Sequence, residues 1–241
     1  MAAQGAMEGR LDARPPAGAP AAAGLPPGLH RLGLAEPRDG LVYVPASAPA
    51  DGPGPLVLLL HGAGGDAAGV LPLLYAEADR AGAVLLAPDS RRRTWDFIVR
   101  SYGPDVAFID LALEAVFASR WVDPARIAVA GFSDGASYAL SLGLINGDLF
   151  THVLAFAPGF MAPTDLEGRP AVYVSHGTDD PVLPVDACSR RLVPRLREAG
   201  YAVRYREFQG GHAVPAAVAA EAMDLLLAGR AGRSASPSKS A

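Results

Sequence analysis

The stretch GFSDG at residues 131–135 directly follows the run RIAVA at residues 126–130. That run has the length and the apolar character of a buried strand. Gly131 and Gly135, two residues on either side of Ser133, have no side chain, so they permit a tight turn and close packing of the helix that follows. The stretch therefore predicts that Ser133 lies on a sharp strand-to-helix turn, with its hydroxyl exposed at the end of the strand.

Seven other short apolar or alternating runs are bounded by Gly, Pro or Asp and are further strand candidates: 29–34, 41–45, 56–60, 83–87, 153–157, 171–175 and 203–207. From 56–60 onward, the runs alternate with helical patterns at about 66–81, 104–120, 134–146, 186–199 and 215–228. This alternation is typical of a mainly parallel sheet, and successive apolar positions such as LVLLL indicate strands covered on both faces. We expect an α/β fold, a three-layer α/β/α sandwich with a mainly parallel eight-stranded sheet whose first two strands form an antiparallel edge hairpin.

Four segments that combine glycines with His, Ser or Asp residues follow predicted strands: HGAGG at 61–65, GFSDG at 131–135, HGTDDP at 176–181 and GGH at 210–212. In sheets of this kind, ligands bind beyond the carboxyl ends of the strands. We therefore expect these four segments to converge on one edge of the sheet.

The segments supply a serine, an acid and a histidine in that order. A serine hydroxyl is a poor nucleophile until a base removes its proton, and the base needs a carboxylate to orient it. With these motifs, the chain resembles the α/β-hydrolase superfamily, and within it the compact phospholipase/carboxylesterase branch, which includes acyl-thioesterases; the resemblance covers roughly residues 41–228. It implies a serine hydrolase that cleaves carboxylic esters through an acyl-enzyme formed on Ser133.

The acid is a choice between two adjacent carboxylates, Asp179 and Asp180. In the branch that the chain resembles, the acid stands immediately before the proline of the HG-x-x-D-P segment, which implies Asp180. Pro181 also biases Asp180 away from helical backbone geometry, toward an extended turn. Asp179 remains the alternative, and is otherwise interpreted as a turn residue that bonds its own backbone.

His212 is the candidate base because it alone among the histidines follows both Ser133 and the acid in a loop after a strand. His61 and His176 each precede a glycine at a strand end, and we interpret them as loop-shaping groups that hydrogen-bond the backbone.

An acyl-transfer site also needs backbone N–H donors for the oxyanion of its tetrahedral intermediate. Asp134, the residue after the nucleophile, supplies one donor at a helix N-terminus. The resemblance implies that Ala63, in HGAGG, supplies the second. The alternative interpretation of HGAGG, a phosphate-binding glycine loop, is disfavoured because no Lys-Ser/Thr pair follows it and it is not part of a G-x-G-x-x-G pattern.

About a dozen residues separate the runs 153–157 and 171–175, too few for the helical cap that larger lipases of this fold insert there. We expect no cap domain and a site shaped by short loops at 90–97 and 158–163. Trp95, Phe160 and Met161 are candidates for an acyl or aromatic pocket, with ordinary packing of loop residues as the alternative.

The chain has 241 residues, 50% of them hydrophobic, which suits one catalytic domain over residues 28–229. Residues 1–27 are dominated by Ala, Gly and Pro, and we expect a disordered arm there. Residues 230–241 are small, polar and proline-broken, which predicts a disordered tail.

The formal net charge of −4 leaves no basic excess for a nucleic-acid partner, and the longest apolar run is far too short for stable membrane insertion. Cys188 is the only cysteine, so no intrachain disulfide forms, and we expect a cytoplasmic protein. No group of residues has metal-ligand spacing, so we expect no metal and no cofactor.

The expected partner is a small-molecule ester or thioester. Within the same chemistry, a polyester or feruloyl esterase and an acyl-thioesterase are the alternatives, since HGAGG and GGHAVP also resemble esterases of the first kind. From a different class, a catalytically silent binding protein on a hydrolase scaffold remains open, although such proteins usually lose a member of the catalytic set.

Overall fold

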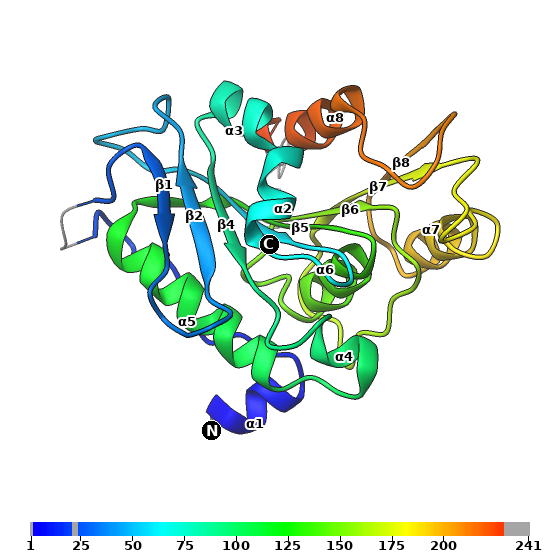
Figure 1. Cartoon of the computed structure of the whole chain (residues 1–241), viewed down its shortest axis with the longest axis horizontal. Coiled ribbons are helices and arrows are strands. Elements are labelled where there is room, and N and C mark those ends of the chain that lie inside the picture. Colours follow the sequence, from blue (N-terminus) through cyan, green and yellow to red (C-terminus); the bar gives the residue numbers. More distant parts are fainter. Residues whose placement is uncertain (1, 21–23, 229–241) are drawn as a thin grey trace, which may run out of the picture.

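The computed structural model describes residues 2–20 and 24–228, which form one eight-stranded sheet with helices on both faces (Figure 1). The strand order is β1-β2-β4-β3-β5-β6-β7-β8. The strands are β1 (Gly28–Arg31), β2 (Gly40–Val44), β3 (Gly54–Leu60), β4 (Val84–Pro88), β5 (Val122–Phe132), β6 (His152–Phe156), β7 (Ala171–Gly177) and β8 (Val203–Phe208).

The pairing of the strands confirms the predicted sheet. β1 and β2 form an antiparallel hairpin at one edge, and β2 also pairs antiparallel with β4. All the remaining neighbours, from β4 through β3 to β8, pair in parallel. Each predicted strand is present to within a few residues. The carboxyl ends of β3, β5, β7 and β8 therefore meet at one edge of the sheet, as the segments that follow them require.

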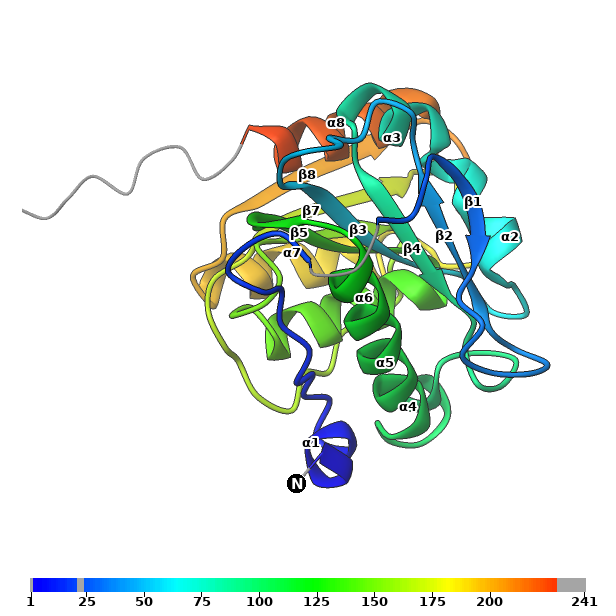
Figure 2. The same ribbon diagram turned by 90° about the vertical axis from the view of Figure 1, so that its left-hand side faces the viewer.

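Two hydrophobic cores cover the two faces of the sheet, because successive residues of a strand point to opposite sides. In β3, Leu56, Leu58 and Leu60 face one core and Val57 and Leu59 face the other. The first core is closed by α1 (Ala2–Met7), α4 (Asp96–Val99), α5 (Pro104–Ser119), α6 (Asp134–Ile145) and α7 (Ser189–Glu198). The second is closed by α2 (Ala67–Val70), η1 (Leu71–Leu73), α3 (Tyr75–Ala81) and α8 (Ala216–Leu227), which gives the predicted three layers (Figure 2).

The single helix expected over 66–81 is instead three pieces. α2 starts at the N-cap Asp66, whose Oδ1 accepts from Gly69 N at 2.8 Å. Pro72 then lies at the start of η1, where its missing N–H and fixed φ favour a new helix start over continuation of α2. α3 restarts at Tyr75. The prediction of one continuous helix over 66–81 is therefore wrong, and the proline is the residue that accounts for the break.

The segment between β6 and β7 contains no helix. Residues 157–170, all of them described, run as an irregular loop that is attached to α6 by hydrogen bonds to Ser137 and Ser141 and to the residues after α6 by a bridge between Gly147 and Gly168. The prediction that no cap domain is inserted here is confirmed.

The expectation of a disordered arm over 1–27 is wrong for much of its length. Leu11 and Ala13 are buried, and Leu11 N donates to Asn146 Oδ1 at 2.9 Å. Asp110 Oδ1 accepts from the backbone N–H groups of both Asp12 and Ala13 at 2.8 Å. Side chains about 100 residues or more distant in sequence thus hold this segment, which composition alone does not reveal. Residues 21–23 of the arm and the tail 230–241 lie outside the described residues.

The turn between β5 and α6 passes very close to β3. A Cβ added to Gly135 would lie 2.2 Å from Leu60 O, and one added to Gly131 would lie 2.1 Å from Gly135 O. Real Cβ atoms do not approach backbone this closely, so both positions need glycine. Between them, Ser133 has φ 57° and ψ −122°, outside the conformations that L-residues prefer. The predicted sharp turn is therefore present.

We predict that Leu11→Ala destabilises the protein by about 2 to 3 kcal/mol, because it removes a buried side chain from the core. The measurement is the urea midpoint of unfolding, with Leu166→Ala as the control, since Leu166 is an exposed leucine on a loop. Equal midpoints for the two variants would contradict the packing of this segment.

We predict that Gly135→Ala destabilises the fold by at least about 3 kcal/mol, since the new methyl group forces β3 and α6 apart. The control is Gly52→Ala, because a Cβ at Gly52 meets nothing within 4 Å. A thermal-unfolding comparison checks it, and a Gly135→Ala protein as stable as the control would show that the two segments are not in contact.

Candidate active site

Ser133 lies at the junction of β5 and α6, half-buried, with its N–H donated to Phe156 O at 3.0 Å. Its positive φ costs on the order of 1 to 3 kcal/mol, and such strain is a common mark of functional positions. The loop after β3 lies directly against it, because a Cβ on Gly62 would be 3.3 Å from Ser133 Cβ. Two of the four predicted segments are thus in contact.

The loops after β7 and β8 bring Asp180 to His212. His212 Nδ1 lies 2.6 Å from Asp180 Oδ2, and the side chain of Asp180 is fully buried while that of His212 is 15% exposed. The His212 ring also packs on the ring of Phe132, with centroids 4.6 Å apart. Because Phe132 immediately precedes Ser133, this contact brings the histidine to the strand end that carries the serine.

The position of Asp180 depends on close packing between the two loops. A Cβ on Gly177 would lie 2.3 Å from both Gly210 O and Gly211 O, so the loop that carries His212 presses on the turn that carries the acid. Asp179 N donates to Gly210 O at 3.0 Å. Asp179 is exposed, and its carboxylate accepts a hydrogen bond from the side chain of the adjacent Thr178. Asp180, in contrast, contacts His212.

The carboxylate of Asp180 is held ionised. Burial by itself would raise its pKa, but hydrogen bonds from Leu183 N at 2.9 Å, from His212, and from Val182 N at 2.8 Å outweigh burial and leave the pKa below its usual value. A buried anion with these donors is a fixed negative charge beside the imidazole, which is what a histidine base requires.

The loop after β3 is shaped by His61. Its Nε2 accepts from Ser90 N at 3.0 Å, so the proton lies on Nδ1, which donates to Gly62 O at 2.7 Å. Gly64 N donates to Arg93 O at 2.7 Å, and the intervening residue, Ala63, is exposed. The interpretation of His61 as a loop-shaping residue agrees with these contacts.

Asp134 is the first residue of α6, where helix geometry leaves backbone N–H groups without an intrahelical partner. Its carboxylate accepts from Thr94 Oγ1 at 2.7 Å, so the loop before α4 is attached to this helix start. Asp134 directly follows Ser133, and Ala63 follows Gly62, which contacts Ser133. The backbone of each candidate donor therefore belongs to a segment at the serine.

A pocket of about 270 Å³ opens beside the loop after β3. Its lining combines the backbone of this loop with apolar side chains of α2, η1 and β5: His61, Gly62, Ala63, Gly65, Asp66, Gly69, Val70, Leu73 and Phe132. Sequence reasoning missed Val70, Leu73 and Phe132. The signal for Phe132 was its place beside Ser133 in GFSDG, whereas no motif in the sequence marks Val70 or Leu73.

The predicted pocket residues lie elsewhere. Trp95 is fully buried, stacked between His61 and Tyr138, and its Nε1 donates to His61 O at 2.8 Å. It is a core residue, and its candidacy for a pocket is wrong. Phe160 is 39% exposed and packs on Phe97, and Met161 packs against the core, so the packing alternative describes both better.

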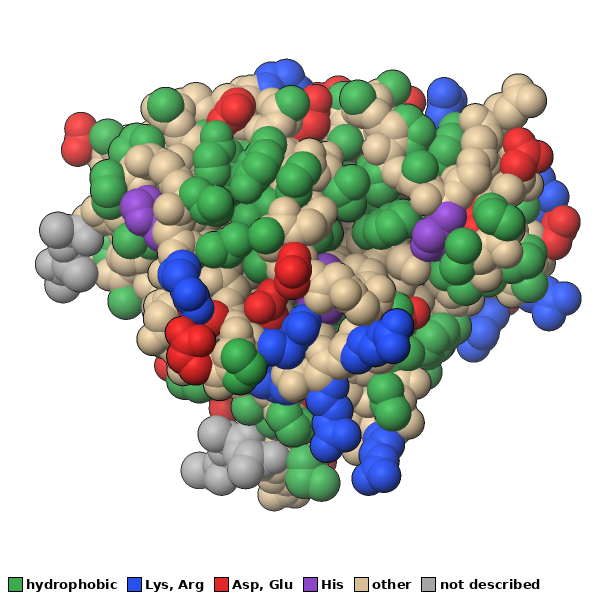
Figure 3. Space-filling view, viewed as in Figure 1, with side chains coloured by type: hydrophobic (Ala, Val, Ile, Leu, Met, Phe, Trp, Pro, Cys, Tyr) green, Lys and Arg blue, Asp and Glu red, His purple; other side chains and the backbone are tan. Residues whose placement is uncertain are grey.

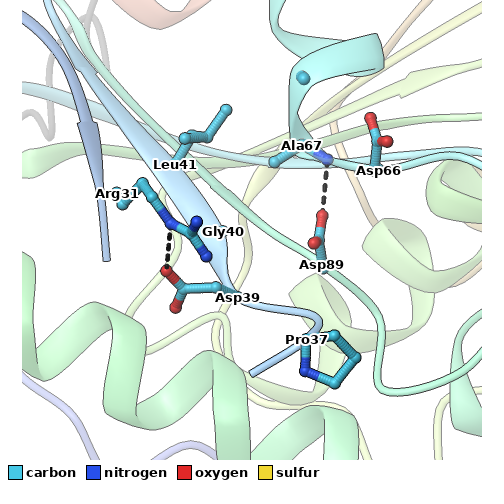
Figure 4. Close-up of a pocket in the computed structure, with 9 residues that line it drawn as sticks. Arg31, Pro37, Asp39, Gly40, Leu41, Asp66, Ala67 and Asp89 are labelled. Atoms are coloured by element: carbon cyan, nitrogen blue, oxygen red, sulfur yellow. Dashed lines mark hydrogen bonds and ion pairs between the residues drawn. The ribbon is translucent and has the colours of Figure 1, made fainter. Parts of the chain in front are cut away.

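A second hollow, of about 210 Å³, lies between β2 and the start of α2 (Figure 4). Its charged side chains are already engaged. Asp89 Oδ1 accepts from Ala67 N at 2.7 Å, and Arg31 Nε lies 3.7 Å from Asp39 Oδ2. The first contact joins the end of β4 to the start of α2, and the second joins β1 to the residue before β2, so we interpret this cluster as structural.

The face shown in Figure 3 carries hydrophobic side chains gathered in the region of α2 and basic side chains gathered in the region of α4. Apolar and basic side chains therefore gather in different regions of this face. Within the described part of the chain, no helix is long and apolar enough to cross a membrane.

The chain is similar in sequence and in fold to known esterases. Feruloyl esterase C of Emericella nidulans is 31% identical over 157 residues, which cover 62% of this chain and 57% of that protein. The chain thus spans less than two thirds of this curated relative. The crystal structure of esterase PE8 superposes with a TM-score of 0.64 at 25% identity over 78% of this chain and 97% of that one.

A ferulic acid esterase from Anaeromyces mucronatus, solved with ferulic acid, has a TM-score of 0.58 at 19% identity, covering 77% of this chain and 84% of that one, and supports the fold alone. The pattern of the phospholipase/carboxylesterase family matches residues 98–225, which is more than half of the chain; Ser133, Asp180 and His212 lie within this stretch. The chain therefore belongs to the phospholipase/carboxylesterase family of α/β-hydrolases.

Proposed function

We propose that this protein is a serine hydrolase that cleaves carboxylic esters through an acyl-enzyme on Ser133. The observation that carries the proposal is the 2.6 Å contact between His212 Nδ1 and buried Asp180, with the histidine ring packed on the residue that precedes Ser133. Ser133, His212 and the Asp180 carboxylate lie at the same edge of the sheet. Their chemistry is that of a nucleophile, its base and the acid that orients the base.

In the proposed reaction, the proton that His212 shares with Asp180 lies on Nδ1, so Nε2 has the free lone pair and takes the proton of the Ser133 hydroxyl. Ser133 Oγ attacks the ester carbonyl, and the backbone N–H groups of Ala63 and Asp134 bind the oxyanion. The protonated imidazole gives its proton to the leaving alcohol, which departs. Water then repeats the sequence on the acyl-enzyme and releases the acid.

The pocket lined by Val70, Leu73 and Phe132 favours an ester with an apolar group near the reacting carbonyl. A feruloyl ester, whose acyl part is aromatic, is the second candidate, because several of the relatives matched by sequence are named feruloyl esterases or probable feruloyl esterases. An acyl-thioester and a polyester use the same chemistry. We propose a cytoplasmic location, because a chain whose only cysteine is Cys188 forms no intrachain disulfide, as is usual for proteins of a reducing compartment.

We predict that Ser133→Ala and His212→Ala each lower ester turnover by about 10⁴-fold or more, the usual loss when a triad member is removed, while the fold stays intact. The measurement is hydrolysis of p-nitrophenyl esters of increasing chain length, beside methyl ferulate, a lysophospholipid and an acyl-thioester. Ser137→Ala, which removes a hydroxyl one helical turn further along α6, is the control. Either variant keeping more than about a hundredth of wild-type turnover would remove that residue from the proposed mechanism.

We predict that Asp180→Asn lowers kcat by roughly 10³ to 10⁴-fold, because an amide in this place no longer fixes the tautomer of His212 or stabilises its charged form. Asp179→Asn is the matched control, one residue away and exposed, and should cost less than about twofold. If Asp179→Asn showed the large loss of kcat and Asp180→Asn kept nearly normal kcat, Asp179 would be the acid.

A further inference from the structure

A second histidine contacts the same carboxylate oxygen as His212. His176, the penultimate residue of β7, is fully buried, and its Nε2 lies 3.3 Å from Asp180 Oδ2 and 2.7 Å from Leu183 O. Its Nδ1 lies 2.6 Å from the hydroxyl of Ser189, which is also buried. Two imidazoles therefore share one oxygen of Asp180.

The contacts of His176 fix its protonation state. Both neighbours of Nε2, a carbonyl and a carboxylate oxygen, only accept hydrogen bonds, so Nε2 must carry a proton. Burial lowers the pKa of His176, and this outweighs the opposing effects of Leu183 O and Asp180, so the ring is neutral. Nδ1 then has a lone pair, and the Ser189 hydroxyl donates to it.

With His176 in place, both oxygens of Asp180 are fully used. Oδ1 accepts from Val182 N and Leu183 N, and Oδ2 meets the two histidines. The side chain of Asp180 is fully buried, so bulk solvent does not supply donors to these oxygens in the intact protein. The charge available to His212 on Oδ2 is therefore set partly by whether His176 donates to the same oxygen.

The other titratable groups around His176 are neutralised or uncharged. Glu207 faces it across the β7–β8 pair, but its carboxylate is bound by Arg190 at 2.6 Å and by Tyr205 Oη at 2.8 Å. Burial raises the pKa of the Cys188 thiol, which therefore stays protonated. Asp180 and His212 are left as the groups that respond to His176.

We propose that His176 is a positioning residue of this site: a neutral, Nε2-protonated ring, oriented by Ser189, that holds Asp180 in place and moderates the basicity of His212. Its effect on turnover rests on the proposed function. The protonation state of the ring and its coupling to His212 do not, because they are observable without any reaction.

The test compares two amide substitutions of His176 that differ in reach. In His176→Gln, the amide nitrogen falls near the position of Nε2, so the donor to Asp180 is retained. In His176→Asn, the shorter side chain falls near the position of Nδ1, so it keeps the Ser189 contact and loses the one to Asp180. The two variants bury the same chemical group, and thermal unfolding checks that both are folded.

We expect His176→Gln to keep kcat within about threefold of wild type. His176→Asn should lose roughly ten- to a hundredfold in kcat with KM within about twofold, the rate equivalent of one hydrogen bond to a charged group. In the Asn variant, the acidic limb of the kcat/KM profile should also move to higher pH, because Oδ2 with one donor fewer holds the His212 proton more tightly. Equal losses in both variants with unchanged profiles would mean that the ring only fills space, and would overturn the proposal.

Ring ¹⁵N NMR of the wild-type protein gives a readout that needs neither variant nor activity. We expect His176 to be in the neutral Nε2–H form at neutral pH, and His176→Asn to shift the ring ¹⁵N signals of His212, because the two rings share Asp180 Oδ2. A His176 ring that carries a proton on both nitrogens at neutral pH, or its single proton on Nδ1, would overturn the proposal, as would His212 signals that do not change in His176→Asn. If Ser133→Ala kept its turnover while these NMR results held, the proposed function would fail and the coupling of the two histidines would stand.

Discussion

The whole site depends on the close approach of β3, the end of β5 and the start of α6. At Gly131 and Gly135, there is no room for a Cβ atom, since added carbons would lie 2.1 and 2.2 Å from backbone carbonyl groups. This approach forces Ser133 into its positive φ and places the loop after β3 against its Cβ. The strain at Ser133 is balanced by the two apolar cores that hold β3 and β5 together.

A second close approach builds the other half of the site. Gly177 lies under the carbonyls of Gly210 and Gly211, which brings the turn after β7 and the loop after β8 together. Asp180 then receives hydrogen bonds from its own turn, from His176 at the end of β7 and from His212 in the loop after β8, so three backbone segments stabilise this buried anion. Sites built on strand ends in this way are held rigidly, which suits a group that must orient an imidazole.

Much of this was readable from the sequence, because the signals were local. Runs of apolar residues bounded by Gly, Pro or Asp gave the strands, and the GFSDG, HGTDDP and GGH segments fell at their ends. The proline after Asp180 separated it correctly from Asp179 as the partner of His212. The break at Pro72 was equally local and was overlooked.

Other features depend on contacts between distant residues, which composition does not encode. Hydrogen bonds to the side chains of Asn146 and Asp110 hold the N-terminal segment. Trp95 is buried in the core, where its Nε1 donates to His61 O. The pocket beside the loop after β3 is lined in part by Val70 and Leu73, which no motif in the sequence marks. The role of His176 required the distances to Asp180 and Ser189.

The measurement that tests the central claim most directly is covalent labelling by a fluorophosphonate, which reacts with an activated serine, followed by mapping of the adduct by mass spectrometry. The account predicts one adduct per folded chain, located on Ser133, and its loss in His212→Ala or after unfolding, because the reaction needs both the strained turn and the base. No adduct on the folded protein, or an adduct on another residue, would contradict it.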